Sequence, residues 1–189
     1  KIRENSDVKV LLVGEGADEL FGGYSWYGVS QLPFRLLPQA IRSLIHYYGI
    51  SRRLSYSGFS FMRNLCEVQG VRDIFNQVAY FEIKYQLPNN YLMKMDKATM
   101  AHSLEARVPY LDHLVVEKAL SLPSSYKLKG QWFNIKESNE KYILREIARK
   151  YLPEEIVSRK KRGFGLPIPQ VLKSNMPRIK DYLLAQNSL

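Results

Sequence analysis

The chain has 189 residues, of which 46% are hydrophobic and 24% charged, with a formal net charge of +10; this fits one folded domain and excludes a disordered or collagen-like chain. Cys66 is the only cysteine, which rules out an internal disulfide and a cysteine-based zinc site. No stretch approaches the roughly 18 apolar residues of a membrane span, so we expect a cytoplasmic protein with no structural metal and no membrane partner.

The first predicted element is a strand at residues 9–13, where the sequence KVLLV is short, apolar and followed by a glycine. Such a run is typical of a buried strand in a parallel sheet. It is the only convincing strand, and a single strand cannot pair its own N–H and C=O groups. We therefore expect its neighbours to lie outside this sequence or in another chain, and the chain to be the later part of a larger α/β domain.

The rest of the chain is predicted to be mostly helical, because apolar residues recur at helical spacing. The expected helices are residues 36–45, 71–85, 91–102, 113–120, 140–151 and 154–158, with further pieces in the tail from Pro167. The sequence Leu87-Pro88-Asn89-Asn90 is expected to end the second of these helices. Pro109 disfavours helix at Val108, so residues 106–109 should be extended. Residues 49–64 are the expected surface loop.

Three segments could carry chemistry, and the first is GEGADELFGGY at residues 14–24. Gly14 and Gly16 permit a tight turn and the close approach of a ligand, and N–H groups at the start of the next helix suit a phosphate. Asp18 and Glu19 fall in the first helical turn, where they could hold Mg²⁺ between phosphates. A glycine-rich turn with acidic capping explains the same residues equally well, since the segment is neither a P-loop nor a dinucleotide fingerprint.

The second segment is LMKMDKATMAHSLEARVP at residues 92–109. The residues expected in the core are Met95, Met100 and Leu104. Asp96 could pair with a surface lysine, and Glu105 with Arg107 could form a structural ion pair before the proline. From spacing alone, a structural role is favoured for this segment, including Lys97.

The third segment is RKKRGFG at residues 159–165, at the end of a basic stretch. Residues 141–162 contain eight basic and three acidic residues, so half of the net charge lies there. Such a cluster suits pyrophosphate or a nucleotide, and a lysine can stabilise charge that develops at a transferred acyl or phosphoryl centre. Basic clusters also serve as solvated surface or bind nucleic acid. No nucleic-acid-binding signature or aromatic stacking platform accompanies this one, which argues against nucleic acid.

Together and in this order, the three segments resemble the C-terminal synthetase domain of bacterial glutamine-dependent asparagine synthetases. The resemblance covers nearly the whole chain. It implies an α/β fold of the adenine nucleotide alpha hydrolase (ATP-pyrophosphatase) type, of which residues 1–189 would be the C-terminal, mostly helical portion. It also implies an activity: MgATP activates the side-chain carboxylate of aspartate as a β-aspartyl-adenylate, and ammonia, made from glutamine by an N-terminal glutaminase domain, displaces AMP.

The resemblance implies roles for individual residues as well. Glu15 and Lys161 would be catalytic, with Glu15 near the reacting centre and Lys161 neutralising charge on phosphate or the tetrahedral transition state. Asp18 would help to hold Mg²⁺ and pyrophosphate. The residues implied to bind ATP or pyrophosphate are Gly14, Glu15, Gly16, Asp96, Lys97 and Lys161. Glu105 and Arg107 match a motif that would be mainly architectural.

The chain departs from the family pattern in what it lacks. Val13 stands where the family turn usually has Ser or Thr, which removes one hydroxyl contact to the nucleotide. The pyrophosphate-binding SGGxDS loop and the N-terminal catalytic cysteine of the glutaminase half do not occur in these 189 residues. We therefore expect this polypeptide alone not to make asparagine.

Two alternatives remain open at this point. One is a related amide-forming synthetase of the β-lactam or lasso-peptide cyclase type, although Glu15 argues against the β-lactam branch, where a tyrosine is usual. The other is a non-catalytic basic helical module that binds nucleic acid, which a salt-dependent affinity for random DNA would reveal.

Overall fold

The computed structural model describes residues 2–31, 36–51, 71, 73–129, 140–159 and 168–185. The chain divides into two compact units, Lys1–Leu152 and Pro153–Leu189. The second unit contains α10 (Glu154–Val157) and α11 (Ile168–Ala185). Across the described ranges, no helix is both long enough and apolar enough to cross a membrane.

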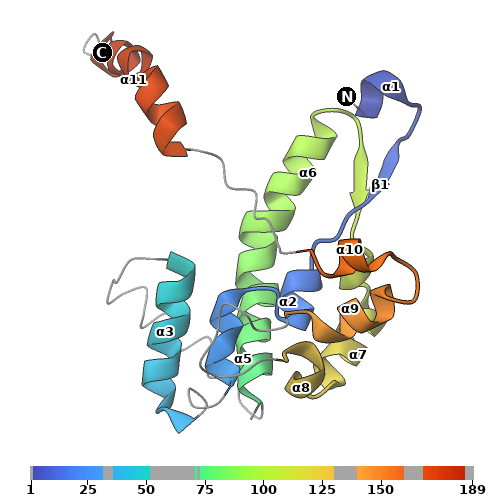
Figure 1. Ribbon diagram of the computed structural model, residues 1–189. Helices are drawn as coiled ribbons and strands as arrows, with labels where there is room; N and C mark the ends of the chain where they lie inside the picture. The colour runs from blue at the N-terminus through green and yellow to red at the C-terminus, as the bar shows by residue number, and fades with distance from the viewer. Residues whose placement is uncertain are drawn as a thin grey trace. The chain divides into compact units, whose positions relative to one another are not determined.

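The first unit contains most of the described elements (Figure 1). In chain order they are α1 (Ile2–Asn5), β1 (Val10–Leu12), α2 (Ala17–Phe21), the 3₁₀-helix η1 (Ser25–Ser30), α3 (Gln39–Ser51), α5 (Ile74–Phe81), the π-helix η3 (Glu82–Leu92), α6 (Met93–Met100), β2 (Glu105–Arg107), the 3₁₀-helix η4 (Pro109–Leu111), α7 (His113–Ser121), α8 (Ser124–Lys127) and α9 (Tyr142–Ala148). Most of the helices expected from the sequence are therefore present within a few residues. The predicted loop is wrong for residues 49–51, which end α3, and residues 52–64 lie outside the described part, as does Cys66.

Aspartate side chains cap two of these helices. The Asp73 carboxylate accepts a hydrogen bond from the Asn76 N–H at the start of α5 (2.9 Å). The Asp112 carboxylate accepts one from the Leu114 N–H at the start of α7 (2.9 Å). Each bond satisfies an N–H group that the first turn of a helix cannot pair internally, which fixes where the helix begins.

The described sheet has two parallel strands, β1 and β2. Their register pairs Val10 with Glu105, Leu11 with Ala106 and Leu12 with Arg107. The expectation that every neighbour of the first strand lies outside the sequence is therefore wrong. The second strand escaped prediction because it is three residues long and two of them are charged. The expected burial of the first strand is also wrong, since the Leu12 side chain is 75% exposed.

The predicted helix end at Leu87-Pro88-Asn89-Asn90 is wrong as well. The helical backbone continues from α5 through η3 into α6, with right-handed helical angles at both junctions, Glu82 and Leu92. Pro88 lies inside η3, whose π-type hydrogen bonds replace the α-helical pattern that a proline interrupts. Of the residues expected in the core here, Leu104 is buried, Met95 is half-buried and Met100 is exposed.

Two apolar clusters form the core of the first unit. The first consists of the buried residues Tyr27, Val29, Phe75, Val78, Ala79 and Leu128. The second consists of Leu20, Phe21 and Ala119. The first cluster joins η1 to α5, and the second fixes α2 against α7, because Leu20 and Phe21 at the end of α2 belong to it. The glycine turn that precedes α2 is thereby attached to a packed body.

Candidate active site

The glycine turn at residues 14–16 connects the carboxyl end of β1 to the start of α2. The Val13 N–H donates to the Arg107 carbonyl (2.9 Å), so the turn begins where the parallel pair ends. Gly16 has φ +93°, and a Cβ there would lie 2.4 Å from the Leu111 side chain. Glycine is therefore required at this position for two reasons: the positive φ disfavours a side chain, and Leu111 of η4 occupies the space that a Cβ would need. A Cβ on Gly14 would meet no atom of the described residues within 4 Å, so these residues leave open space beside it.

Asp18 lies in the first turn of α2, as the sequence predicts, and forms an ion pair with Lys141. The Lys141 Nζ lies 2.9 Å from the Asp18 Oδ1, and both side chains are about one-quarter exposed. The Gly22-Gly23 pair ends α2: Gly22 has φ +71°, and the Gly23 N–H donates to the Asp18 carbonyl (2.8 Å). A Cβ on Gly23 would lie 1.7 Å from the Asp18 Oδ1, so only glycine lets the chain pass beneath this carboxylate.

The possibility that Glu19 shares a Mg²⁺ ion with Asp18 does not fit the position of its side chain. The side chain is 1% exposed and accepts a hydrogen bond from the Tyr24 hydroxyl (2.7 Å). Its backbone carbonyl accepts another from the Tyr27 hydroxyl (2.5 Å). Burial raises the pKa of the Glu19 carboxyl, opposed by the Tyr24 hydrogen bond. Glu19 therefore anchors α2 to η1 and is turned away from solvent.

A second buried carboxylate, Glu82 of η3, joins three elements. Its Oε1 accepts a hydrogen bond from the Trp26 Nε1 (2.8 Å) and lies 3.2 Å from the His46 Nε2 of α3. Trp26 stacks on Tyr24 with ring centroids 4.5 Å apart, and Tyr24 in turn contacts Tyr91. Burial raises the pKa values of both tyrosines. These contacts connect the helix after the glycine turn to the helix that leads into α6.

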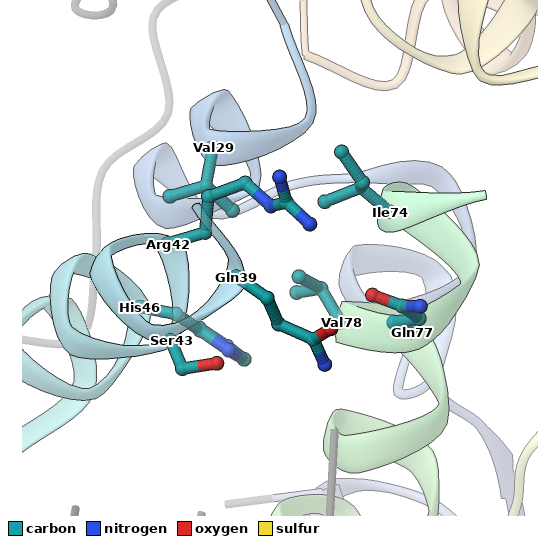
Figure 2. A pocket seen from close by; sticks show the side chains of 8 residues that line it. All are labelled: Val29, Gln39, Arg42, Ser43, His46, Ile74, Gln77 and Val78. Atoms are coloured by element: carbon teal, nitrogen blue, oxygen red, sulfur yellow. The ribbon is translucent and has the colours of Figure 1, made fainter. Parts of the chain in front are cut away.

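His46 also lines a small cleft, open to solvent, between η1, α3 and α5 (Figure 2). Its lining residues are Val29, Gln39, Arg42, Ser43, His46, Ile74, Gln77 and Val78. Two of the polar side chains are held by backbone carbonyls, because Arg42 donates to Leu37 and Gln77 donates to Val71. The cleft thus belongs to the packing of α3 on α5 and shares no lining residue with the glycine turn.

The second sequence segment is mostly on the surface. Asp96 and Lys97 are exposed on α6, and no hydrogen bond or ion pair joins either side chain to the glycine turn within the described part of the chain. The expected ion pair is present: the Arg107 Nε donates to the Glu105 Oε1 (2.8 Å), and this hydrogen bond raises the pKa of Arg107. The backbone of the same two residues forms the ends of β2, which fits the architectural role that the resemblance implies.

The third sequence segment is largely outside the described residues. Lys161 falls there, with its neighbours from Lys160 to Pro167, while Arg159 is exposed in the second unit. Lys141 is the functional candidate that sequence reasoning missed at the glycine turn. The only signal was its place at the start of the basic stretch, and that stretch gave no hint of its pairing with Asp18. The residues described contain no group of three or more His, Cys, Asp or Glu side chains that could hold a metal ion.

The chain matches the model of one known protein family. The family model for asparagine synthase matches residues 1–189, the whole chain. The chain belongs to the asparagine synthase family. The resemblance predicted from the three sequence segments is therefore confirmed.

Curated relatives carry the same family name. Asparagine synthetase [glutamine-hydrolyzing] 1 of Bacillus subtilis (strain 168) is 31% identical over 212 residues, which cover 89% of this chain and 32% of that protein. A putative asparagine synthetase of Mycobacterium bovis is 32% identical over 88% of this chain and 31% of its own length. Asparagine synthetase of Gallus gallus is 28% identical over 96% of this chain and 25% of its own length. The chain thus spans about a quarter to a third of the length of these relatives.

Proposed function

We propose that the chain is the C-terminal portion of the synthetase domain of a cytoplasmic, glutamine-hydrolysing asparagine synthetase. Its fold would be the adenine nucleotide alpha hydrolase type, and its partner would be an N-terminal glutaminase domain. The observation that carries the proposal is the glycine turn at the carboxyl end of β1, directly beside the parallel strand β2. Open α/β sheets bind their ligands at the carboxyl ends of their strands. The reaction is proposed from the names of the relatives.

The proposed reaction has two steps. A side-chain carboxylate oxygen of aspartate attacks the α-phosphorus of ATP, and the bond from that phosphorus to pyrophosphate breaks. Ammonia derived from glutamine then attacks the acyl carbon of the β-aspartyl-adenylate, the bond to AMP breaks, and asparagine forms. Both steps build up negative charge on phosphate or acyl oxygens, which positively charged groups and N–H donors stabilise.

The proposed roles follow the geometry where the structure describes it. Gly14 and Gly16 would lie against the nucleotide, and the open space beside Gly14 fits the close approach of a phosphate. Glu15, half-buried between them, would lie near the reacting centre. Lys161 would neutralise charge on the phosphates or the transition state. Asp96 and Lys97 would line the pocket.

Mg²⁺ is proposed as the cofactor that ATP brings to the site, with Asp18 as its ligand. Bound there, the ion would neutralise charge on the leaving pyrophosphate. A carboxylate is a ligand that Mg²⁺ prefers, but the Asp18 carboxylate is held by Lys141 at 2.9 Å. Metal binding must therefore compete with this ion pair.

Pyrophosphate release from MgATP, measured with and without aspartate, tests the function. The 189-residue chain alone should show no aspartate-dependent release. The same chain, substituted for its matched region in the B. subtilis relative, should show release, and Glu15→Gln or Lys161→Ala should lower it at least about 100-fold. Glu117→Gln, at an exposed position of α7, is the matched control and should leave it unchanged. A folded chimera without release would contradict the proposed function.

A further inference from the structure

The helix α2, which follows the glycine turn, depends on its neighbours for its position. It is five residues long, too short for its own hydrogen bonds to hold it in place. Leu20 and Phe21 attach it to the second apolar cluster, and Asp18 forms the partly exposed ion pair with Lys141. Glu19 attaches it to η1 by hydrogen bonds. The direction of α2 is therefore set by these side chains.

Two tyrosine hydroxyls hold Glu19 at two different points. The Tyr24 hydroxyl donates to the side-chain Oε1 (2.7 Å), and the Tyr27 hydroxyl donates to the backbone carbonyl (2.5 Å). Tyr27 is fully buried and belongs to the first apolar cluster, so its hydroxyl fixes the backbone of α2 relative to that cluster. Attachment through both the backbone and the side chain of one residue restricts rotation of α2 about its axis.

The Tyr24 hydroxyl is itself held in place by the rings around it. The Tyr24 ring stacks on Trp26 with centroids 4.5 Å apart and on Tyr91 with centroids 6.2 Å apart. Trp26 is fixed in turn by the hydrogen bond from its Nε1 to the Glu82 Oε1 (2.8 Å). The donor to Glu19 is therefore locked by packing and by a further hydrogen bond, as the supporting residues of a precise site must be.

Rotation of α2 would move residues that the proposed function uses. Neighbouring residues of an α-helix lie about 100° apart around the axis, so Glu19 can face the interior while Asp18 faces Lys141. The glycine turn is joined to the helix, because the Leu20 N–H donates to the Gly16 carbonyl (3.0 Å). A change in the direction of α2 at Glu19 therefore reaches both Asp18 and the turn.

The carboxyl group of Glu19 is buried at a cost that packing alone does not explain. Its side chain is 1% exposed, and its second oxygen, Oε2, has no hydrogen-bond partner among the described residues. Burial, together with the charges of Asp18 and Glu82, raises the pKa of this carboxyl, so its surroundings disfavour the negative charge. A methionine would fill similar space without an unpaired buried oxygen. What the carboxyl supplies and a methionine does not is the acceptor for the Tyr24 hydroxyl.

We infer that Glu19 is a positioning residue for the phosphate and Mg²⁺ site proposed at the glycine turn. Held by Tyr24 and Tyr27, it sets the direction of α2, and with it the direction of the Asp18 side chain and the place of the turn. This inference rests on the proposed function for the reaction that the site performs. It goes beyond that function by assigning a role to a buried residue that is turned away from the proposed ligands.

Pyrophosphate release by the chimera at varied MgATP tests this role. Glu19→Met removes the acceptor and should raise the KM for MgATP at least about tenfold. Glu19→Gln keeps an oxygen acceptor for Tyr24 and should stay within about twofold of the unsubstituted chimera. Both variants remove a buried carboxyl, so neither should lower the urea midpoint of unfolding. A merely structural residue would not lower MgATP affinity without lowering stability.

A double-mutant cycle identifies the route through Tyr24. Tyr24→Phe removes the donor to Glu19 and should raise the KM for MgATP in the chimera. Added to Glu19→Met, it should change that KM by less than about twofold, because the bond that it breaks is already absent. Tyr126→Phe, which removes a hydroxyl from an exposed tyrosine of α8, is the matched control and should change the KM in neither background. Equal effects of Tyr24→Phe in both backgrounds would overturn the route through Glu19.

Amide chemical shifts of the 189-residue chain test the inference without catalysis. Glu19→Met should shift the amide signals of Gly14, Glu15 and Gly16, whereas Glu19→Gln should leave them in place. Unchanged signals in Glu19→Met, or an unchanged KM for MgATP in an active chimera, overturn the inference and leave the proposed function standing. Shifted signals together with an unsubstituted chimera that folds but releases no pyrophosphate support the positioning of the turn by Glu19 and contradict the proposed function.

Discussion

Two regions of the first unit differ in which side chains they bury and which they expose. The packed region, formed by α2, η1, α3, α5, η3 and α8, buries charged groups such as Glu19, Glu82 and Lys127 together with partners. The open region, formed by β1, β2 and α6, leaves apolar groups such as Leu12 and Met100 in solvent. The packed region buries its polar groups with partners, whereas in the open region the wholly apolar strand β1 is left partly exposed beside the charged residues of β2 and α6.

The largest expected difference between the two regions is in the stability lost when one large apolar side chain in each is replaced by alanine. Phe75 is fully buried in the packed region, so Phe75→Ala should lower the free energy of unfolding by about 3–5 kcal/mol. Leu12→Ala in the open region should change it by no more than about 0.5 kcal/mol. Urea unfolding of both variants measures the difference. A comparable loss for Leu12→Ala would show that β1 is covered in solution and would remove the contrast.

The next largest expected effect is a pH dependence of stability, which originates at Lys127 in the packed region. The Lys127 Nζ is buried, donates to the Asn76 Oδ1 (3.2 Å) and lies 4.5 Å from the centre of the Phe75 ring. Burial lowers its pKa to about 8, opposed by the charge of Asp73. Between about pH 8 and 10 the unfolded chain therefore binds more protons than the folded chain. Stability should rise with pH over that range, by roughly 1.4 kcal/mol per unit.

The variant Lys127→Met isolates this contribution. It should remove the rise between pH 8 and 10, and at pH 7 it should leave the chain at least as stable as the original, because it removes a buried charge. The exposed lysine Lys118 of α7 gives the control Lys118→Met, which should keep the rise. A pH profile that is the same for the chain and for Lys127→Met would mean that water reaches this ammonium group.

The glycine turn, where the two regions meet, should respond differently at its two glycines. Gly16→Ala places a side chain at φ +93° against Leu111 and should cost about 1–3 kcal/mol of stability. Gly14→Ala should change stability by less than about 0.5 kcal/mol, since a Cβ there meets no described atom within 4 Å. If the turn binds a nucleotide, however, Gly14→Ala should weaken ATP binding measured by calorimetry on the chimera. Equal losses of stability would contradict the geometry.

The smallest effect concerns the ion pair between Asp18 and Lys141. Both side chains are partly exposed, so a double-mutant cycle with Asp18→Asn and Lys141→Met should give a coupling of about 0.5–1 kcal/mol. The coupling should shrink in 1 M salt, because screening weakens exposed pairs more than buried ones. A coupling that salt does not change would show that the pair is shielded from solvent.

The sequence was most informative where a local signal sufficed. The helix at residues 113–120 could be predicted because an aspartate cap precedes a periodic apolar run. The turn at Gly14 and Gly16 could be predicted because glycine after an apolar strand permits a tight change of chain direction. The Glu105–Arg107 pair was also predictable from its spacing. The family could be recognised because three segments occur together.

The features that could not be predicted from the sequence depend on contacts between residues far apart in the chain. β2 is too short and too charged to be recognised before its pairing with β1 is known. The burial of Glu19 follows from Tyr24 and Tyr27 closing over it, which the acidic pattern of the turn does not reveal. Likewise, Lys141 lies 123 positions after the carboxylate it pairs with. The assignments of Glu15, Asp96, Lys97 and Lys161 stay predictions.

The uninterrupted helix from Ile74 to Met100 has a mechanical consequence for a complete enzyme. α5, η3 and α6 form one rod that starts among core residues and ends in the open region (Figure 1). At about 1.5 Å per residue the rod is close to 40 Å long. Its inner end is held by Phe75, which lies in the first apolar cluster, and by Glu82, which accepts a hydrogen bond from Trp26. The only place along it with non-α geometry, and hence the natural position for a bend, is the π-helical segment around Pro88.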